Sequence, residues 1–341
     1  MQGLSERFGI DPRDVVYFTH GTTVGVNAVV QRKGLRLALI TTRNFEDVLD
    51  IARLKIPDMY HLMSRRPEPL ITRDRVFGVD GRMRPDGSEE TPIDEASVLA
   101  ALDALDALKA AQCEGVVVSL LYCYRNPAHE LQVKAIIEKA APGFFVSCSH
   151  EVWPIIREYE RTVTATIGGY VQPRVSQYLT RLQAALAESG VGADLKVTKS
   201  NGGVMSAENG KNNCVQMILS GTAAGVIGAS YLAGMCGIKD CMSLDIGGTT
   251  ADVALIVDGK PQYATGEYIG DFQIHIPSVS VSSIGDGGGS IAWVDDFGVL
   301  KVGPESAGSN PGPVCYGRGG TRPTITDAFA VIGVLGRASL G

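Results

Sequence analysis

The hydrophobic pattern in the first half of the chain alternates between strand-like runs and helical spacing. Apolar and β-branched residues predict strands at 35–42, 115–124 and 144–149. Apolar residues at helical spacing over 94–108 predict a helix capped by its first residue, and 130–140 predicts another. Strand, helix and strand thus follow one another with short connections. This order is typical of a parallel α/β layer with right-handed crossovers.

A segment rich in proline, glycine and charge separates the first two of these strands. Residues 65–91 contain Pro67, Pro69 and the turn-forming run Pro85–Gly87. Such residues favour turns over regular core strands. The segment is therefore predicted to be a surface excursion or hairpin.

The second half of the chain continues the alternation of helices and strands. Apolar residues within 175–186 share one helical face, and this helix is predicted to end at Gly190. An alanine-rich helix is predicted at 221–235, where the N–H groups of the first turn could receive an anion. A strand at 195–198 and a hairpin at 242–257 complete the pattern. We therefore expect three parts: a first α/β lobe at 1–160, a connecting segment at 161–239 and a second lobe at 240–341.

Composition narrows the class of protein. The 341 residues are 45% hydrophobic and 20% charged, which predicts an ordinary soluble protein long enough for two domains. The net charge of −6, with no basic stripe, argues against a nucleic-acid partner. No uninterrupted apolar run approaches membrane-spanning length, so we expect a cytoplasmic protein that does not bind membranes. The seven cysteines and five histidines are scattered and lack the spacing of a zinc site.

The run Ser243–Val253 is the most informative motif, because it predicts two short strands joined by a turn of two glycines and two threonines. Such a turn can direct N–H groups and hydroxyls at the oxygens of a polyphosphate. Asp245 precedes the turn and is our candidate catalytic carboxylate and Mg²⁺ ligand. An ordinary tight hairpin is the alternative. The candidate phosphate-binding residues of the turn are Gly247, Gly248, Thr249 and Thr250.

A second glycine cluster follows. Gly287, Gly288 and Gly289 could form a backbone cradle near the nucleotide or the substrate. The carboxylate of Asp286 would repel a phosphate there unless a metal or a lysine intervened, and a simple flexible turn is the alternative. The sequence contains no Gly-x-x-x-x-Gly-Lys pattern, which excludes a P-loop mechanism, and no strand-linked Gly-x-Gly-x-x-Gly fingerprint supports a dinucleotide site.

His20 stands between a strand-like run at 15–18 and a helix that begins near Thr23. Its imidazole could donate to a substrate carbonyl or transfer a proton, and Thr22 and Thr23 could contact the substrate. A histidine that braces the turn and threonines that cap the helix are the alternatives. Asn201 and Gly202, in the turn after the strand at 195–198, are further candidate substrate contacts.

Two more charged positions are candidates. Asp327 could supply a catalytic base or a second metal carboxylate, although capping of the helix that begins at Ala328 explains it equally well. The alternating charges of Arg157–Arg161 are most simply an ion-paired helix start, with Arg157 as an alternative anion contact.

The order of these motifs resembles the hydantoinase A and 5-oxoprolinase family, which also supplies subunits of acetone- and acetophenone-type carboxylases. The resemblance covers nearly the whole chain, and the Ser243–Val253 hairpin is part of it. The other segments that carry it are Thr19–Thr23, Asn27–Val29, Arg157–Thr162, Ser200–Val204, Ser220–Gly225, Gly287–Asp295, Val302–Gly308, Pro311–Pro313, Cys315–Gly317 and Pro323–Ala328.

The resemblance implies an α/β fold of the actin and sugar-kinase type, in which two duplicated ATPase lobes each donate one phosphate-binding hairpin. Only one such hairpin is present, and His20 comes almost at once, where relatives first have an aspartate-glycine-glycine-threonine motif. We therefore expect a first lobe that lacks its first strands, and a chain that is also cut short after Asp327.

The resemblance also implies the reaction. Family members use ATP and Mg²⁺ to phosphorylate a carbonyl oxygen, and the ring-opening members then hydrolyse a lactam or cyclic imide such as 5-oxoproline or a hydantoin. We expect an A-type subunit that works with a hydantoinase B-type subunit, as part of an oligomer. A subunit of an ATP-dependent ketone carboxylase is one alternative, and a noncatalytic fragment of such a protein is another.

Overall fold

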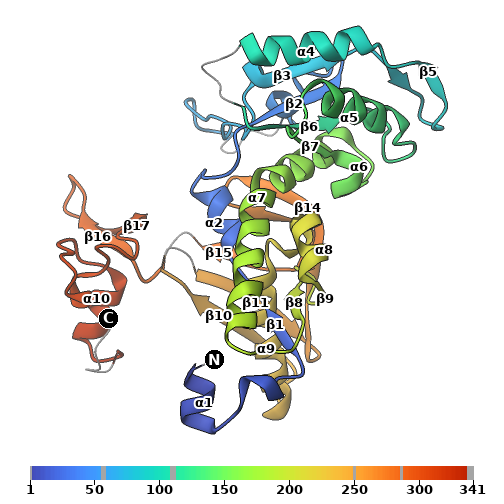
Figure 1. Ribbon diagram of the computed structural model, residues 1–341. Coiled ribbons are helices and arrows are strands. Elements are labelled where there is room, and N and C mark those ends of the chain that lie inside the picture. Colours follow the sequence, from blue (N-terminus) through green and yellow to red (C-terminus); the bar gives the residue numbers. More distant parts are fainter. Residues whose placement is uncertain (1, 55–58, 108–112, 249–250, 285–286, 336–341) are drawn as a thin grey trace. The chain divides into compact units, whose positions relative to one another are not determined.

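The computed structural model describes residues 2–54, 59–107, 113–248, 251–284 and 287–335 of a mixed α/β protein (Figure 1). The chain forms two compact units. Unit 1 comprises Met1–Ala223 with Ala264–Ser278, and unit 2 comprises Ala224–Tyr263 with Val279–Gly341.

A four-stranded parallel sheet in unit 1 confirms the predicted α/β layer, with strand order β3-β2-β6-β7 (Figure 1). Alternate residues face opposite sides, so that Leu37 and Leu39 join one apolar cluster, whereas Ala38 and Ile40 join the other. Residues of helix α7 belong to the first cluster, and residues of helices α4 and α5 belong to the second. The elements are β2 (Leu37–Thr42), β3 (Val76–Val79), β6 (Gly115–Ser119), β7 (Phe145–Cys148), α4 (Glu95–Ala107), α5 (Ala128–Ala140) and α7 (Glu158–Glu188).

One strand of this sheet lies where the sequence predicted a surface excursion. Within residues 65–91, β3 pairs with β2, and Val76 and Val79 are buried. The buried Arg75 supports the pairing, because its guanidinium donates to the Leu37 carbonyl over 2.9 Å. Strand β3 has four residues, which is too few to show an alternation of apolar and polar positions beside so many turn-forming residues. The prediction of a surface excursion was therefore wrong for this strand. The rest of the segment includes the predicted hairpin, β4 (Arg82–Met83) with β5 (Glu89–Thr91).

A second, three-stranded sheet in unit 1 has the order β1-β8-β9. The parallel strands β1 and β8 are in register from Phe18 opposite Leu195 to His20 opposite Val197. Their carboxyl ends therefore emerge at the same edge of the sheet. The elements around it are α1 (Gln2–Phe8), η1 (Pro12–Asp14), β1 (Phe18–His20), α2 (Val24–Val30), α3 (Val48–Ile51), η2 (Arg73–Arg75), α6 (Ser149–Val152), β8 (Leu195–Thr198), β9 (Val204–Ser206), α8 (Ala207–Asn212), η3 (Cys214–Met217), β13 (Tyr263–Ile269) and β14 (Phe272–Val279).

The long helix α7 explains why the units differ from the three parts expected from the sequence. It runs through the expected boundary at 160 and contacts β6 of the parallel sheet as well as α2 and α8. Helix α7 thus packs against elements from different parts of unit 1. Residues 161–223 therefore belong to the same compact unit as the first part of the chain and form no separate connecting segment.

Unit 2 is built around the predicted hairpin, whose strands β10 and β11 pair antiparallel from Cys241 opposite Ile256 to Ile246 opposite Ala251. Strands β12 and β15 also pair with β11. The elements are β10 (Cys241–Ile246), β11 (Ala251–Val257), β12 (Lys260–Pro261), β15 (Ser282–Ile284), β16 (Ser290–Val294), β17 (Leu300–Ser306), η4 (Val314–Tyr316) and α10 (Ile325–Val331). Helix α9 (Ser220–Met235) begins in unit 1 and continues into unit 2.

Among the described residues, one helical stretch is long and apolar enough to cross a bilayer by length and composition alone. It covers Cys214–Met235, with a mean hydropathy of 1.4 over its most apolar part, of which 28% is buried. The sequence expectation concerned only uninterrupted apolar runs. Within this stretch Ser220 is fully buried and hydrogen-bonded to Thr22.

Candidate functional site

Two glycine-rich loops of unit 2 lie against each other. The Gly288 N–H donates to the Gly247 carbonyl over 2.8 Å, and the Gly289 N–H donates to the Gly248 carbonyl over 2.7 Å. A Cβ at Gly289 would lie 2.7 Å from the Gly248 oxygen, so this approach requires glycine. We call the contact of Gly247 and Gly248 with Gly288 and Gly289 the glycine junction.

The amides of the second loop are engaged inside the protein. The Gly287 N–H donates to Ser290 Oγ over 2.9 Å, while the Gly288 and Gly289 amides form the glycine junction. The Gly288 carbonyl accepts from both the N–H and the hydroxyl of Thr326, over 2.8 and 2.7 Å. The loop therefore braces the hairpin through its amides, and the role of Gly287–Gly289 as a cradle for the nucleotide or the substrate stays a prediction. Thr249, Thr250 and Asp286 lie outside the described residues.

Two aspartates oppose each other across the hairpin. Asp245 of β10 is in register with Asp252 of β11; Asp245 is exposed and Asp252 is half-buried. Directly opposed residues of an antiparallel pair lie on one face of the sheet, where two carboxylates repel each other unless a cation reduces the repulsion. This pair of donors fits Mg²⁺, which binds one or two carboxylates and keeps several waters. The sequence reasoning missed Asp252, although it follows the turn at the same distance as Asp245 precedes it.

Asp327 is the third residue of helix α10 and completes the capping box of its N-cap residue, Thr324. Its carboxylate accepts from the Thr324 N–H over 2.8 Å and from the Cys315 N–H over 2.7 Å, and Thr324 completes a capping box. Burial alone would raise the pKa of the Asp327 carboxyl, but the hydrogen bonds from Cys315 and Thr324 outweigh it and lower the pKa below its ordinary value. The structure thus shows the capping that the sequence offered as the alternative to a catalytic role.

In unit 1, the candidate substrate residues gather at the carboxyl edge of the β1-β8-β9 sheet. The loop after β1 is hydrogen-bonded to the start of α9, because the Thr22 N–H donates to Ser220 Oγ over 3.1 Å and the Ser220 hydroxyl donates to the Thr22 carbonyl over 3.2 Å. The turn after β8 is tied to the same place, since the Leu219 N–H donates to Ser200 Oγ over 3.2 Å. Three segments far apart in the sequence therefore meet at this edge.

The candidate side chains at this edge of the sheet differ in their burial and in the hydrogen bonds that they form. Thr22 is buried and its Oγ1 accepts from the Val24 N–H, whereas Thr23 is exposed at the N-terminal boundary of α2 and makes no cap hydrogen bond there. Asn201 is exposed, and its Oδ1 accepts from the Gly203 N–H within a turn. Gly202 has a φ of 83°, a conformation that favours glycine in this turn.

His20 is held by a tyrosine. Its Nε2 lies 2.6 Å from the hydroxyl of Tyr178 on α7, and the two rings are tilted with centroids 5.7 Å apart. Burial lowers the pKa of the His20 imidazole, which favours its neutral form. The contact with Tyr178 agrees with the alternative in which His20 braces the structure. The neutral ring keeps a second nitrogen that could exchange a proton.

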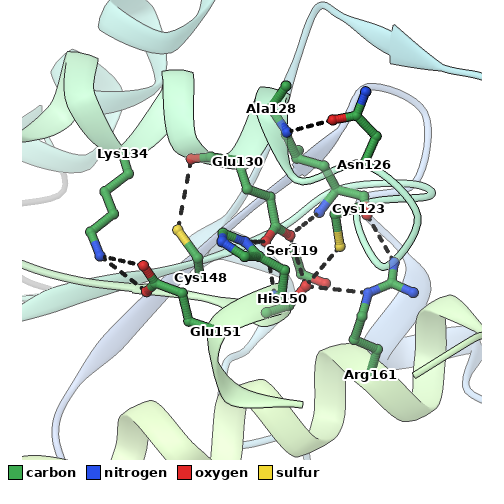
Figure 2. Close-up of polar contacts among 12 residues, drawn as sticks. Ser119, Cys123, Asn126, Ala128, Glu130, Lys134, Cys148, His150, Glu151 and Arg161 are labelled. Atoms are coloured by element: carbon green, nitrogen blue, oxygen red, sulfur yellow. Dashed lines mark hydrogen bonds and ion pairs between the residues drawn. The ribbon is translucent and has the colours of Figure 1, made fainter. Parts of the chain in front are cut away.

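A buried polar cluster that the sequence did not predict lies at the carboxyl ends of β6 and β7 (Figure 2). Glu130 is fully buried in the first turn of α5, and its carboxylate accepts from the N–H groups of Leu120 and His150, from the Ser149 hydroxyl and from His150 Nδ1. The buried Arg161 donates to Ser149 Oγ and to the carbonyls of Leu120 and Ile155. Arg161 is thus a core residue and does not form the surface ion pair expected from its sequence neighbours.

Among the described residues, this cluster is also the one group of three or more potential metal ligands, since atoms of Glu130, Cys148 and His150 lie within 4.8 Å of one another. It does not fit a metal. Four protein donors already occupy the Glu130 oxygens, and burial raises the pKa of the Cys148 thiol far above its ordinary value. Burial likewise raises the pKa of nearby Cys123 to about 12. The cluster is therefore structural, and it joins α5, α6 and α7 to the sheet.

Family comparisons cover most of the chain. The family model described as Hydantoinase/oxoprolinase matches residues 161–341, and the model for the N-terminal region of the same family matches residues 1–141.

Similar proteins include both lactam-opening and carboxylating enzymes. The chain is 35% identical to the caprolactamase subunit alpha of Pseudomonas jessenii, over 99% of this chain and 49% of that protein, and it matches the crystal structure of this ATP-dependent caprolactamase with a TM-score of 0.76. It is 37% identical to the acetophenone carboxylase gamma subunit of Aromatoleum aromaticum, over 98% of this chain and 47% of that protein. Nucleotide-free acetone carboxylase matches with a TM-score of 0.81 at 34% identity, over 93% of this chain and 46% of that chain.

The chain spans about half the length of these relatives. Because the family model covers 161–341 and its N-terminal companion covers 1–141, and because the fold agrees with both solved structures, the chain belongs to the hydantoinase/oxoprolinase family.

Proposed function

We propose that the chain is part of an A-type subunit that uses ATP to open a lactam or cyclic imide ring. The observation that carries this proposal is the hairpin of unit 2, with Asp245 opposite Asp252 and its turn braced by the glycine junction. The likeness to an ATP-dependent caprolactamase supports it. We also propose that the units belong to lobes of the actin and sugar-kinase type.

In this proposal the hairpin positions the triphosphate of ATP. Asp245 and Asp252 would hold Mg²⁺, which neutralises charge on the phosphates during transfer. The close approach of the second loop holds Gly247 and Gly248, the first two residues of the turn, in place.

The chemistry follows from the poor reactivity of an amide carbonyl. Transfer of the γ-phosphoryl group to the carbonyl oxygen gives a phosphorylated imidate and ADP. Water then adds to the carbon, and the ring C–N bond breaks as the nitrogen is protonated, which leaves an acyl phosphate. A second water hydrolyses the acyl phosphate to the carboxylate and phosphate. His20, neutral and held by Tyr178, is our candidate for one of the proton transfers.

A carboxylase subunit is the second candidate, because the acetone and acetophenone carboxylase relatives match the chain as well as the caprolactamase does. In that case the phosphorylated species is an enol, and the second substrate derives from bicarbonate. Dependence of ATP turnover on bicarbonate would favour this candidate over the ring-opening enzyme.

We further propose a hydantoinase B-type partner, assembly into an oligomer and a cytoplasmic location. Several relatives are named as subunits, which supports the expectation of partner chains.

Calorimetric titration with Mg-ATP tests the proposal. We expect saturable binding by this chain, and loss of at least tenfold in affinity in the Asp245→Asn variant, because the substitution removes one of the two opposed charges. The matched control is Asp258→Asn at the other end of β11, where Asn tolerates the φ of 51°. Unchanged Mg-ATP affinity in the Asp245→Asn variant would contradict the proposed metal site.

A further inference from the structure

The backbone of His20 is held by its neighbours in unit 1. It lies at the carboxyl end of β1, where His20 is in register with the fully buried Val197 of β8. The next residue, Gly21, approaches the start of α9 so closely that a Cβ there would lie 3.2 Å from the Ser220 carbonyl oxygen. The place of the imidazole is therefore set by the fold, and what the ring can do depends on its two nitrogens.

The partner of the ring is held as firmly. Tyr178 lies on α7 between Val175 and Leu179, which are both buried in the core. The half-buried side chain of Tyr178 packs against the same core cluster, and its hydroxyl lies 2.6 Å from His20 Nε2. Both residues are thus positioned by packed elements, and the hydrogen bond between them is a fixed feature of unit 1.

The length of this hydrogen bond and the chemistry of its two groups indicate which group donates. With oxygen acceptors, bonds donated by a hydroxyl are typically about 2.7–2.8 Å long and bonds donated by an N–H about 2.9–3.0 Å, so 2.6 Å favours the Tyr178 hydroxyl as the donor. A neutral imidazole nitrogen is also a much stronger base, and hence a better acceptor, than a phenol oxygen. Burial lowers the pKa of the His20 imidazole, so the ring is neutral near pH 7. With Nε2 as the acceptor, the proton of this neutral ring lies on Nδ1.

The second nitrogen of the ring is accessible from outside the protein. Among the described residues, the buried side-chain polar atoms without a hydrogen-bond partner belong to Thr166, His275 and Ser278. His20 Nδ1 has no hydrogen bond to the described residues and yet is not one of these buried atoms, so it reaches the surface. Because Tyr178 occupies Nε2, a molecule that approaches the ring meets an N–H donor at Nδ1.

We propose that Tyr178 is a positioning residue that holds His20 in the Nδ1–H tautomer, so that His20 presents a hydrogen-bond donor to an oxygen of the substrate. A histidine that merely braced the turn would do so in either tautomer, whereas a donor at Nδ1 needs the tautomer that Tyr178 selects. An N–H group aimed at an oxygen that gains negative charge stabilises the transition state. The inference rests on the proposed function for the substrate, and it narrows the role of His20 to donation from Nδ1.

The tautomer can be measured in the chain without nucleotide or substrate. Long-range proton–nitrogen NMR correlations of the imidazole ring distinguish the two tautomers, and the signals that disappear in His20→Gln identify His20. At about pH 8, above the ordinary histidine pKa of about 6.5, we expect the Nδ1–H tautomer to predominate. Tyr178→Phe keeps the ring and removes the hydroxyl. In this variant the ratio of the Nδ1–H to the Nε2–H tautomer should fall about threefold to tenfold, which corresponds to the loss of one hydrogen bond.

Tyr170→Phe is the matched control. Tyr170 lies on the same helix, and its ring packs against Gly34. The tautomer ratio of His20 in Tyr170→Phe should equal that of the unaltered chain. Predominance of the Nε2–H tautomer in the unaltered chain, or equal ratios in Tyr178→Phe and Tyr170→Phe, would overturn the inference. The measurement on the unaltered chain decides the tautomer even if Tyr178→Phe fails to fold.

Two substitutions of His20 test the donor role. The side-chain N–H of asparagine can take the place of Nδ1–H, whereas the longer side chain of glutamine places its N–H near Nε2. His20→Gln should therefore lower caprolactam-dependent ATP turnover about a hundredfold, the effect of losing one preorganised donor, while His20→Asn should retain most of it. Equal losses in the two variants would contradict donation from Nδ1.

The outcomes separate this inference from the proposed function. The NMR measurement contains neither nucleotide nor lactam, so a predominant Nε2–H tautomer would overturn the inference even if Mg-ATP binds as proposed. Absence of Mg-ATP binding would contradict the proposed function and leave the assignment of the tautomer standing.

Discussion

Replacement of Glu130 by glutamine should strongly destabilise unit 1. The carboxylate accepts four hydrogen bonds at full burial, whereas the amide of glutamine would direct two N–H donors at groups that are themselves donors. Hydrogen bonds to a charged group contribute about 1.5–3 kcal/mol each, and breaking a buried ionic network costs about 3–5 kcal/mol. Because such contributions are not additive, we expect the free energy of unfolding to fall by about 3–5 kcal/mol for Glu130→Gln.

Urea unfolding followed by the fluorescence of Trp153, which ends helix α6 in unit 1, measures this change. A Trp293→Phe background removes the signal of unit 2, since the chain has two tryptophans. Glu138→Gln on the same helix is the control, because Glu138 is exposed, and it should change the free energy by less than about 0.5 kcal/mol.

The pH dependence supplies a second readout. Burial alone would raise the pKa of the Glu130 carboxyl, but the hydrogen bonds from His150, Leu120 and Ser149 outweigh it and lower the pKa. A lowered folded-state pKa stabilises the fold fully above the ordinary value of about 4.3, and this stabilisation is lost as the pH falls through the folded-state pKa. The difference between the unaltered chain and Glu130→Gln should therefore be constant near neutral pH and shrink below about pH 4. A loss under 1 kcal/mol at pH 7 would refute the role assigned to this cluster.

Two further predictions concern unit 2. Gly289→Ala should destabilise this unit by about 2–4 kcal/mol, because the new Cβ would lie 2.7 Å from the Gly248 carbonyl and break the glycine junction. Thermal unfolding measures this loss of stability, and calorimetry should show that Mg-ATP affinity falls at least tenfold as well. The control is Gly228→Ala on α9, where a Cβ meets open space. Equal effects of the two substitutions would contradict the argument. Asp327→Ala should speed hydrogen exchange of the amides of Cys315 and of α10 by tenfold or more, because a cap residue contributes about 1–2 kcal/mol and this one also holds a loop amide. Exchange rates that match those of the unaltered chain would show that the cap contributes little.

The sequence predicted those elements whose hydrophobic period is long enough to read. The strand at 195–198 has the predicted bounds, and helix α9 starts and the hairpin of unit 2 pairs within a residue or two of the predicted positions. Strand β3 was missed because four residues beside prolines and arginines carry too short a pattern to stand out. The pattern around β1 is also short, so the strand was predicted at 15–18, whereas it lies at Phe18–His20.

The sequence by itself determined the hairpin of unit 2 and the family of the chain, since the order of glycines, threonines and aspartates along the chain is a local property that needs no contacts. Only the tertiary structure decided which distant groups meet: Asp252 with Asp245, and Glu130 with Leu120, Ser149 and His150. It also decided that the amides of Gly287–Gly289 are engaged. The physical reason is that register, burial and the pairing of polar atoms depend on neighbours far away in the chain, and no local pattern of residues records them.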